Sequence, residues 1–150
     1  MNEEIQISAA HESELAWCAR VMASTDPWLA YKFSVETCGG ILRWPGSALF
    51  VARTNEPVGF VLLHPRGFLG CPYIAVIAVV PELRSRGLGT RILEFAEAHF
   101  PGARHVYLCV SSFNTRALRL YQRRGYAKIG ELPNFIADGF SEILMQKCLS

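Results

Sequence analysis

The feature that most constrains the fold is an apolar run that leads directly into a basic segment with two glycines. Residues 73–91 read Y-I-A-V-I-A-V-V-P-E-L-R-S-R-G-L-G-T-R. A short run rich in β-branched residues that ends at a proline is typical of a buried strand. From Leu88 onward, apolar residues recur at the spacing of one helix face. The segment therefore predicts a buried strand, a turn and a helix in succession.

The predicted turn has the composition of an anion-binding site. Gly87 and Gly89 carry no side chains that would keep a ligand from the backbone, and the positive charge comes from Arg84, Arg86 and Arg91. The first N–H groups of a helix lack acceptors within the helix, and the helix dipole makes that end positive. Together these features suit a pyrophosphate. The alternative is that the glycines only permit a tight helix start and the arginines are solvated.

Two other phosphate-binding loops do not match this turn. A P-loop requires lysine and then serine or threonine after its last glycine, where this chain has Thr90 and Arg91. The dinucleotide-binding motif requires a third glycine, where this chain has Ile92. The pattern that remains is Arg-x-x-Gly-x-Gly after an apolar strand.

Composition and charge limit the class of protein. The chain has 150 residues, of which 51% are hydrophobic and 19% charged, which predicts one domain with its own core and excludes a disordered chain. A net charge of +2 does not indicate a nucleic-acid partner. No apolar run is long enough to cross a membrane, and the acidic start has no signal-peptide pattern, so we expect a cytoplasmic protein without a membrane partner. Five scattered cysteines favour reduced thiols, with no metal site.

The order of the expected elements predicts an α/β fold with a mixed, mostly antiparallel twisted sheet of about seven strands flanked by helices. Three successive strands with short connections predict an antiparallel meander, and a helical crossover then predicts one parallel pair. The expected strands are 4–8, 47–53, 57–64, 71–80, 104–110, 126–132 and 141–148. The expected helices are 11–23, a short one within 28–44, 88–100 and 114–123, with a turn at 65–70.

A second motif lies one strand downstream of the first. It consists of Asn114, Ala117, Tyr121, Gly125 and Tyr126 at spacings of three, four, four and one residues. The first motif resembles the coenzyme A pyrophosphate loop of the GNAT superfamily of N-acetyltransferases, and the second resembles their Asn…Ala…Tyr…Gly-aromatic motif. This resemblance extends over essentially the whole chain. It implies the acyl-CoA N-acyltransferase fold, acetyl-CoA as co-substrate without a metal, and a homodimer as an open option.

The resemblance also implies how the cofactor binds. Backbone N–H groups from Arg84 to Thr90 hold the pyrophosphate, and the strand at Ile77 to Val79 splays so that its unpaired groups bind the pantetheine arm. An N–H near Val79 polarises the thioester carbonyl, and Tyr121 protonates the departing thiolate. Without the resemblance, the residues from Ile77 to Val79 and Tyr121 would be interpreted as core residues. The expected cofactor-binding residues are Ile77, Ala78, Val79, Arg84, Ser85, Arg86, Gly87, Leu88, Gly89, Thr90, Asn114 and Tyr121.

The sequence leaves the general base open. Tyr73 occupies a position where many family members have a glutamate and some protein N-terminal acetyltransferases have a tyrosine; the alternative is an ordinary strand aromatic. Where those enzymes often have an assisting histidine on the next strand, this chain has Cys109, which we expect to be an inert strand cysteine. Three carboxylates, Glu36, Asp138 and Glu142, are other candidates that could reach the acceptor.

The chemistry of the acceptor amine favours an α-amine. The reference pKa of an α-amine is near 7.8 and that of lysine near 10.4, so deprotonating lysine at neutral pH costs about 3.5 kcal/mol more. A site without an obvious carboxylate base is therefore expected to acetylate an amino acid, a small amine or a protein N-terminus. The alternatives are an acyl-CoA-binding sensor or regulatory protein without turnover, and a binding partner that uses its aromatic surface. The segments 28–44 and 133–139 are expected to select the acceptor.

Overall fold

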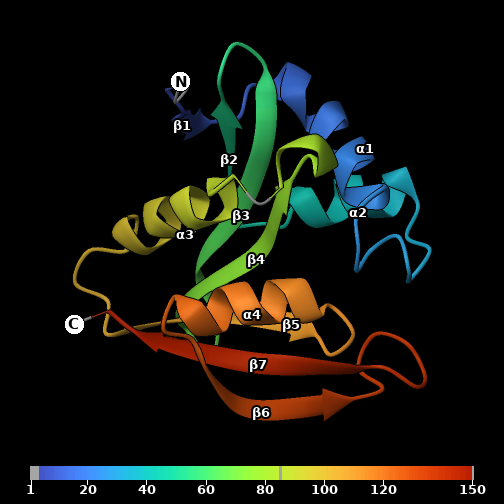
Figure 1. Cartoon of the computed structure of the whole chain (residues 1–150), viewed down its shortest axis with the longest axis vertical. Helices are drawn as coiled ribbons and strands as arrows, with labels where there is room; N and C mark the ends of the chain where they lie inside the picture. Colours follow the sequence, from blue (N-terminus) through green and yellow to red (C-terminus); the bar gives the residue numbers. More distant parts are fainter. Residues whose placement is uncertain (1–3, 85, 150) are drawn as a thin grey trace.

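The computed structural model describes residues 4–84 and 86–149, which form one mixed sheet with helices on both faces (Figure 1). Within these residues the sheet has seven strands, which agrees with the predicted number, and their order is β1-β2-β3-β4-β5-β7-β6. The strands are β1 Gln6–Ala9, β2 Ala48–Arg53, β3 Pro57–Phe68, β4 Cys71–Val79, β5 His105–Ser111, β6 Ala127–Pro133 and β7 Ser141–Cys148. The helices are η1 Glu12–Glu14, α1 Leu15–Ala23, α2 Val35–Leu42, η2 Pro81–Leu83, α3 Leu88–Ala98 and α4 Thr115–Arg123.

The strand directions agree with the prediction. The pairs β1–β2, β2–β3, β3–β4, β5–β7 and β6–β7 are antiparallel, and β4–β5 is parallel. The parallel pair follows from the crossover through α3, which carries the chain back to the same end of the sheet. No helix in the described part of the chain is long and apolar enough to cross a membrane.

The core has two parts, one on each face of the sheet. Helices α3 and α4 cover one face, where Leu63 of β3 packs among Ile92 and Leu93 of α3. Helices α1 and α2 cover the other face, where Leu62 packs among Met22 and other buried residues. Neighbouring residues of β3 therefore contribute to opposite cores, as the alternation of side chains along a strand requires.

Elements at two places differ from the prediction, whereas α2 lies within the range 28–44 expected for it. The turn expected at residues 65–70 is wrong for most of its length, because β3 continues to Phe68 and only Leu69 and Gly70 turn the chain, both with positive φ. The helix expected at 11–23 begins with the separate short turn η1. Helix α2 runs through Gly39 and Gly40, and it starts at Ser34, whose side chain accepts a hydrogen bond of 3.0 Å from the Thr37 N–H.

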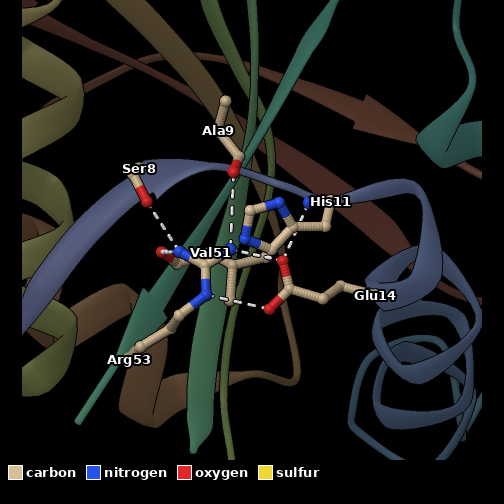
Figure 2. Close-up of polar contacts among 6 residues, drawn as sticks. All are labelled: Ser8, Ala9, His11, Glu14, Val51 and Arg53. Atoms are coloured by element: carbon tan, nitrogen blue, oxygen red, sulfur yellow. Dashed lines mark hydrogen bonds and ion pairs between the residues drawn. The ribbon is translucent and has the colours of Figure 1, made fainter.

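An ion pair and its neighbouring hydrogen bonds connect β1 and η1 to β2 (Figure 2). The guanidinium of Arg53 forms an ion pair with the carboxylate of Glu14, and its Nε donates a hydrogen bond of 2.9 Å to Oε2. Arg53 also donates to the Ser8 hydroxyl at 2.7 Å and to the Ala9 carbonyl, while the His11 N–H donates to Glu14 at 2.8 Å. These contacts hold β1, η1 and β2 together at one end of the sheet.

Candidate active site

Strands β4 and β5 separate shortly after they begin to pair. Their recorded register covers only Tyr73 with Tyr107 and Ile74 with Leu108. On the other side of β4, Val76 pairs with Leu62 and Ile74 with Leu63, so Ala75 is an extra residue that forms a bulge. Bulges bend a strand and increase its twist, and they are common beside active sites. Beyond Ile74, the edge of β4 that faces β5 is therefore open over the described residues, as the resemblance implied.

Two cavities meet in the space between these strands. The larger has a volume of about 610 Å³ and lies beside β4, the start of α3 and helix α4. The smaller has a volume of about 170 Å³ and lies between β4 and β5. Both are lined by Asp26, Ile77, Asn114, Ala117 and Tyr121. A molecule in one cavity can therefore contact a molecule in the other at these residues.

Most of the residues predicted to bind the cofactor line the larger cavity. Arg86 is exposed and Leu88 is buried in the core, and neither lines the cavity; Ser85 lies outside the described residues. Two arginines that sequence reasoning missed, Arg116 and Arg123 of α4, add positive charge to the wall. The predicted residues that line it are Ile77, Ala78, Val79, Arg84, Gly87, Gly89, Thr90, Asn114 and Tyr121.

The two glycines of the basic turn have different structural reasons. Gly87 precedes the first residue of α3 and has a φ of +80°, a conformation that disfavours a side chain. A Cβ at Gly89 would lie 3.0 Å from Cδ2 of Leu120, so this glycine permits α3 and α4 to approach closely. The glycines therefore shape the start of α3, where Gly87, Gly89 and Thr90 line the larger cavity.

The wall of the larger cavity fits the pyrophosphate and pantetheine of coenzyme A. The helix start and the side chain of Arg84 supply positive charge for a diphosphate. The open edge of β4 supplies backbone groups for an amide-containing arm. Asn114 stands at the N-cap of α4 as predicted, but its side chain makes no capping hydrogen bond, and it faces both cavities.

Tyr121 stands where the two cavities meet. It projects from α4, it is 6% exposed, and its ring lies 5.9 Å from that of Tyr126. Burial raises the pKa of the Tyr121 phenol above its usual range. The phenol therefore keeps its proton at neutral pH, as a proton donor must.

Tyr73 and Cys109 lie next to each other in the wall of the smaller cavity. Burial raises the pKa of Tyr73, and contact with the Cys109 thiol raises it further. Burial also raises the pKa of Cys109, although its interaction with Tyr73 opposes this. A phenol and a thiol with raised pKa values remain protonated at neutral pH. Neither is suited to take a proton from an amine without a partner, but the Tyr73 phenol can donate a hydrogen bond.

A buried polar cluster that sequence reasoning did not assemble lies in the same cavity. The Tyr31 hydroxyl donates to Oε2 of Glu142 at 2.7 Å, and the Ser111 hydroxyl donates to the same oxygen at 2.6 Å. Ser111 is fully buried and Glu142 is 5% exposed. Burial raises the pKa of Tyr31 to about 12, opposed by its hydrogen bond with Ser111 and reinforced by Glu142. The sequence carried no signal for this cluster, because it depends on the register that sets Ser111 opposite Glu142.

The three carboxylates considered as candidates for the general base lie at different places in the structure. Glu142 lines the smaller cavity, whereas Glu36 and Asp138 are exposed and line neither cavity. In the segment 28–44, Trp28 lines the smaller cavity, while Tyr31 packs against the rings of Phe113 and Phe140. Among the described residues no cluster of His, Cys, Asp and Glu could hold a metal ion.

The comparison with protein families identifies the fold. A family model described as "Acetyltransferase (GNAT) family" matches residues 11–126, which is more than half of the chain. The chain belongs to the acetyltransferase (GNAT) family. The predicted family and its acyl-CoA N-acyltransferase fold are therefore confirmed, and the predicted class, an acetyl-CoA-dependent acyltransferase, agrees with this membership.

Individual relatives and solved structures are also similar to the chain. This GNAT chain is 31% identical over 135 residues to the N-alpha-acetyltransferase of Saccharolobus solfataricus, with 79% of this chain and 77% of that protein covered. It is 30% identical over 156 residues to an uncharacterised protein of Mycobacterium leprae. That match covers 97% of this chain but 41% of the relative, so the chain spans about two fifths of the relative's length. Among solved structures, Arabidopsis thaliana NAA60 in complex with acetyl-CoA has a similar fold, with a TM-score of 0.76, 20% identity, and 97% and 98% of the two chains covered.

Proposed function

We propose that this domain transfers the acetyl group of acetyl-CoA directly to an α-amine, without an acyl-enzyme intermediate. The observation that carries the proposal is the meeting of the two cavities at Tyr121, beside the open edge of β4. The cavity lined with arginines suits the coenzyme, and the smaller one suits an amine. A direct transfer needs two substrates in contact, and this arrangement supplies the contact point.

Each residue has a defined task in this proposal. Acetyl-CoA, when bound, supplies an acyl carbon activated as a thioester. The start of α3 and Arg84 hold the pyrophosphate, and backbone N–H groups near Val79 stabilise the charge that develops on the carbonyl oxygen. Tyr121 gives its proton to the departing thiolate. Tyr73 is a hydrogen-bond donor at the amine side, because its raised pKa disfavours a role as proton acceptor.

Two arguments support an α-amine as the acceptor. A lysine side chain costs about 3.5 kcal/mol more to deprotonate at neutral pH than an α-amine does. The S. solfataricus relative is named an N-alpha-acetyltransferase. The acceptor classes are an amino acid, a small amine and a protein N-terminus. The alternative function, an acyl-CoA sensor without turnover, gives no reason for a protonated phenol at the junction of the cavities.

The test is to incubate the purified protein with acetyl-CoA and to follow the release of free thiol with a panel of acceptors. The panel contains short peptides with a free N-terminus, amino acids, polyamines and aminoglycosides. The matched controls are the same peptides with an acetylated N-terminus and no lysine. Thiol release with α-amines and not with the blocked peptides is the expected result. Stabilisation by acetyl-CoA without thiol release from any amine would instead support the sensor.

A further inference from the structure

Glu142 has one carboxylate oxygen engaged and one open. Oε2 accepts the hydrogen bonds from Tyr31 and Ser111. Oε1 accepts no hydrogen bond from any described residue. It is also not one of the side-chain atoms that are fully buried without a partner, so part of its surface is accessible. Because the residue lines the smaller cavity, this oxygen is open to that cavity. The protein thus holds an oriented carboxylate in the wall of the smaller cavity.

The charged side chains in the described lining of the smaller cavity are all negative. Its described lining contains two carboxylates, Glu142 and Asp26, and no lysine, arginine or histidine. Asp26 is an exposed residue at the rim, and its Oδ1 already accepts a hydrogen bond of 3.2 Å from the Ala30 N–H. Glu142 is therefore the buried charge of this space. A carboxylate with little water around it attracts a cation strongly and repels an anion strongly.

We propose that Glu142 binds the ammonium group of the acceptor and takes one of its protons, and that its charge excludes acceptors with a carboxylate beside the amine. This inference rests on the proposed acetyl transfer to an α-amine. It narrows the acceptor from α-amines in general to the N-terminus of a peptide chain, where an amide replaces the α-carboxylate. A free amino acid would bring its own carboxylate next to Glu142, with no cation in the described lining to compensate.

The proton balance of the step is complete with groups of this chain. The ammonium gives one proton to Oε1 of Glu142, and the nitrogen lone pair that this releases forms the N–C bond while the C–S bond breaks. Sulfur takes the proton of Tyr121, and the second proton of the nitrogen replaces it on the phenolate. Glu142 returns its proton to solvent when the product leaves. Tyr31 and Ser111 are positioning residues that hold Oε2 and so direct Oε1 into the cavity.

The first test uses the wild-type protein with three matched acceptors: an amino acid, the same amino acid as its amide, and a tripeptide that begins with it. We expect kcat/KM for the amide and the peptide to exceed that for the free acid by about tenfold or more, because two like charges would otherwise meet beside a buried carboxylate that has no cation near it in the described lining. Equal values for the acid and the amide would overturn the inference and leave the proposed function intact. Failure with all α-amines would overturn the proposed function itself.

The second test compares Glu142→Gln with Glu4→Gln and Glu56→Gln, which remove exposed carboxylates outside both cavities and outside the segments expected to select the acceptor. We expect Glu142→Gln to lower kcat/KM for the peptide about 100-fold at pH 6.5, the range of a lost general base, and the controls to stay close to wild type. The loss should shrink by about fifteen- to twentyfold at pH 8.5, because most of an α-amine with a pKa near 7.8 is then already neutral. An unchanged Glu142→Gln variant would overturn the inference.

The pH dependence can be assigned because the phenols and the thiol near Glu142 keep their protons. These groups are Tyr31, which is hydrogen-bonded to Glu142, and Tyr73 of β4, Cys109 of β5 and Tyr121 of α4, which line the same cavity; Asp26 also lines it. The pKa values of the phenols and the thiol are all raised, so none of these groups loses its proton between pH 6.5 and 8.5. A recovery in this range therefore reports the acceptor amine.

A binding measurement without acetyl-CoA completes the test. Calorimetry should detect the peptide with a free N-terminus and give at least tenfold weaker binding for the same peptide with an acetylated N-terminus, because only the former carries the ammonium. Glu142→Gln should abolish this difference while its affinity for acetyl-CoA stays as in wild type, which also shows that the variant is folded. Equal discrimination by the variant and the wild type would overturn the inference.

Discussion

Tyr121 and Tyr126 are two neighbouring buried phenols whose surroundings give them different tasks. Both rings are in the core beside α4, and burial raises the pKa of both. The Tyr126 hydroxyl donates a hydrogen bond of 2.9 Å to Glu97, and the residue lines neither cavity. Tyr121 lines both cavities. Because both side chains have the same chemistry, the difference between their tasks comes from their positions: Tyr121 lies on α4 and Tyr126 lies after its end.

We therefore predict that Tyr121→Phe and Tyr126→Phe affect different properties. Tyr121→Phe should lower kcat by about 100-fold, the usual contribution of a general acid, with unchanged affinity for acetyl-CoA. Tyr126→Phe should leave kcat unchanged and lower the free energy of unfolding by about 1 kcal/mol, because Glu97 loses a hydrogen bond. Steady-state kinetics and urea unfolding measure the two effects. A full rate for Tyr121→Phe would exclude it as the proton donor.

At the scale of elements, the start of α3 determines how the larger cavity is lined. The left-handed conformation of Gly87 turns the chain from η2 into the helix and exposes the N–H groups of the first turn. Gly102, after the end of α3, has the same φ of +80°, and a Cβ at either glycine would contact nothing within 4 Å. The two positions therefore differ in what they are next to, and not in backbone strain.

This pair gives a controlled prediction about the phosphate-binding turn. Gly87→Ala and Gly102→Ala should each lower the free energy of unfolding by about 1 to 2 kcal/mol, the cost of a left-handed alanine. Only Gly87→Ala should weaken acetyl-CoA binding, by about tenfold, because relaxation of the turn misdirects an N–H group that would meet the ligand. Urea unfolding and calorimetry measure both quantities. Equal affinities in the two variants would argue against this turn as the pyrophosphate site.

For the whole molecule, the sheet joins two cores into one unit. Leu62 and Leu63 are neighbours on β3 and both are fully buried, but they contribute to the cores on opposite faces. Because β3 contributes to both cores, a displacement of this strand from one core would also disturb the packing of the other. The open edge of β4, beside the two cavities, therefore belongs to a sheet that is packed on both faces.

We predict that Leu62→Ala and Leu63→Ala each lower the free energy of unfolding by about 2 to 5 kcal/mol, because each leaves a cavity in a packed core. Both variants should still unfold in a single transition with coincident fluorescence and circular dichroism curves. Two separate transitions in either variant would mean that the helices on one face unfold independently of the other.

Local patterns in the sequence predict most of the elements and the cofactor side of the site. The residues of the basic turn act within one turn of chain, so their spacing alone indicates an anion site. Likewise, Asn114 and Tyr121 belong to a single helix, and the helical period relates them. The boundaries of β7 also follow from its sequence. The length of β3 does not, because pairing with β4 resumes at Phe68 with Cys71, beyond an irregular stretch after His64 whose Pro65 and Arg66 suggest a turn.

The amine side of the site depends on contacts between distant parts of the chain. The apolar run of β4 has no alternation that would reveal a bulge at Ala75, and the bulge arises from pairing with β3. Tyr31, Ser111 and Glu142 meet only because the β5–β7 register sets two of them opposite each other and the loop after α1 brings the third. Propensity and spacing act over a few residues, whereas register and packing are decided by the whole sheet. The local sequence therefore determines where a coenzyme can bind, and the tertiary structure decides which carboxylate faces the amine.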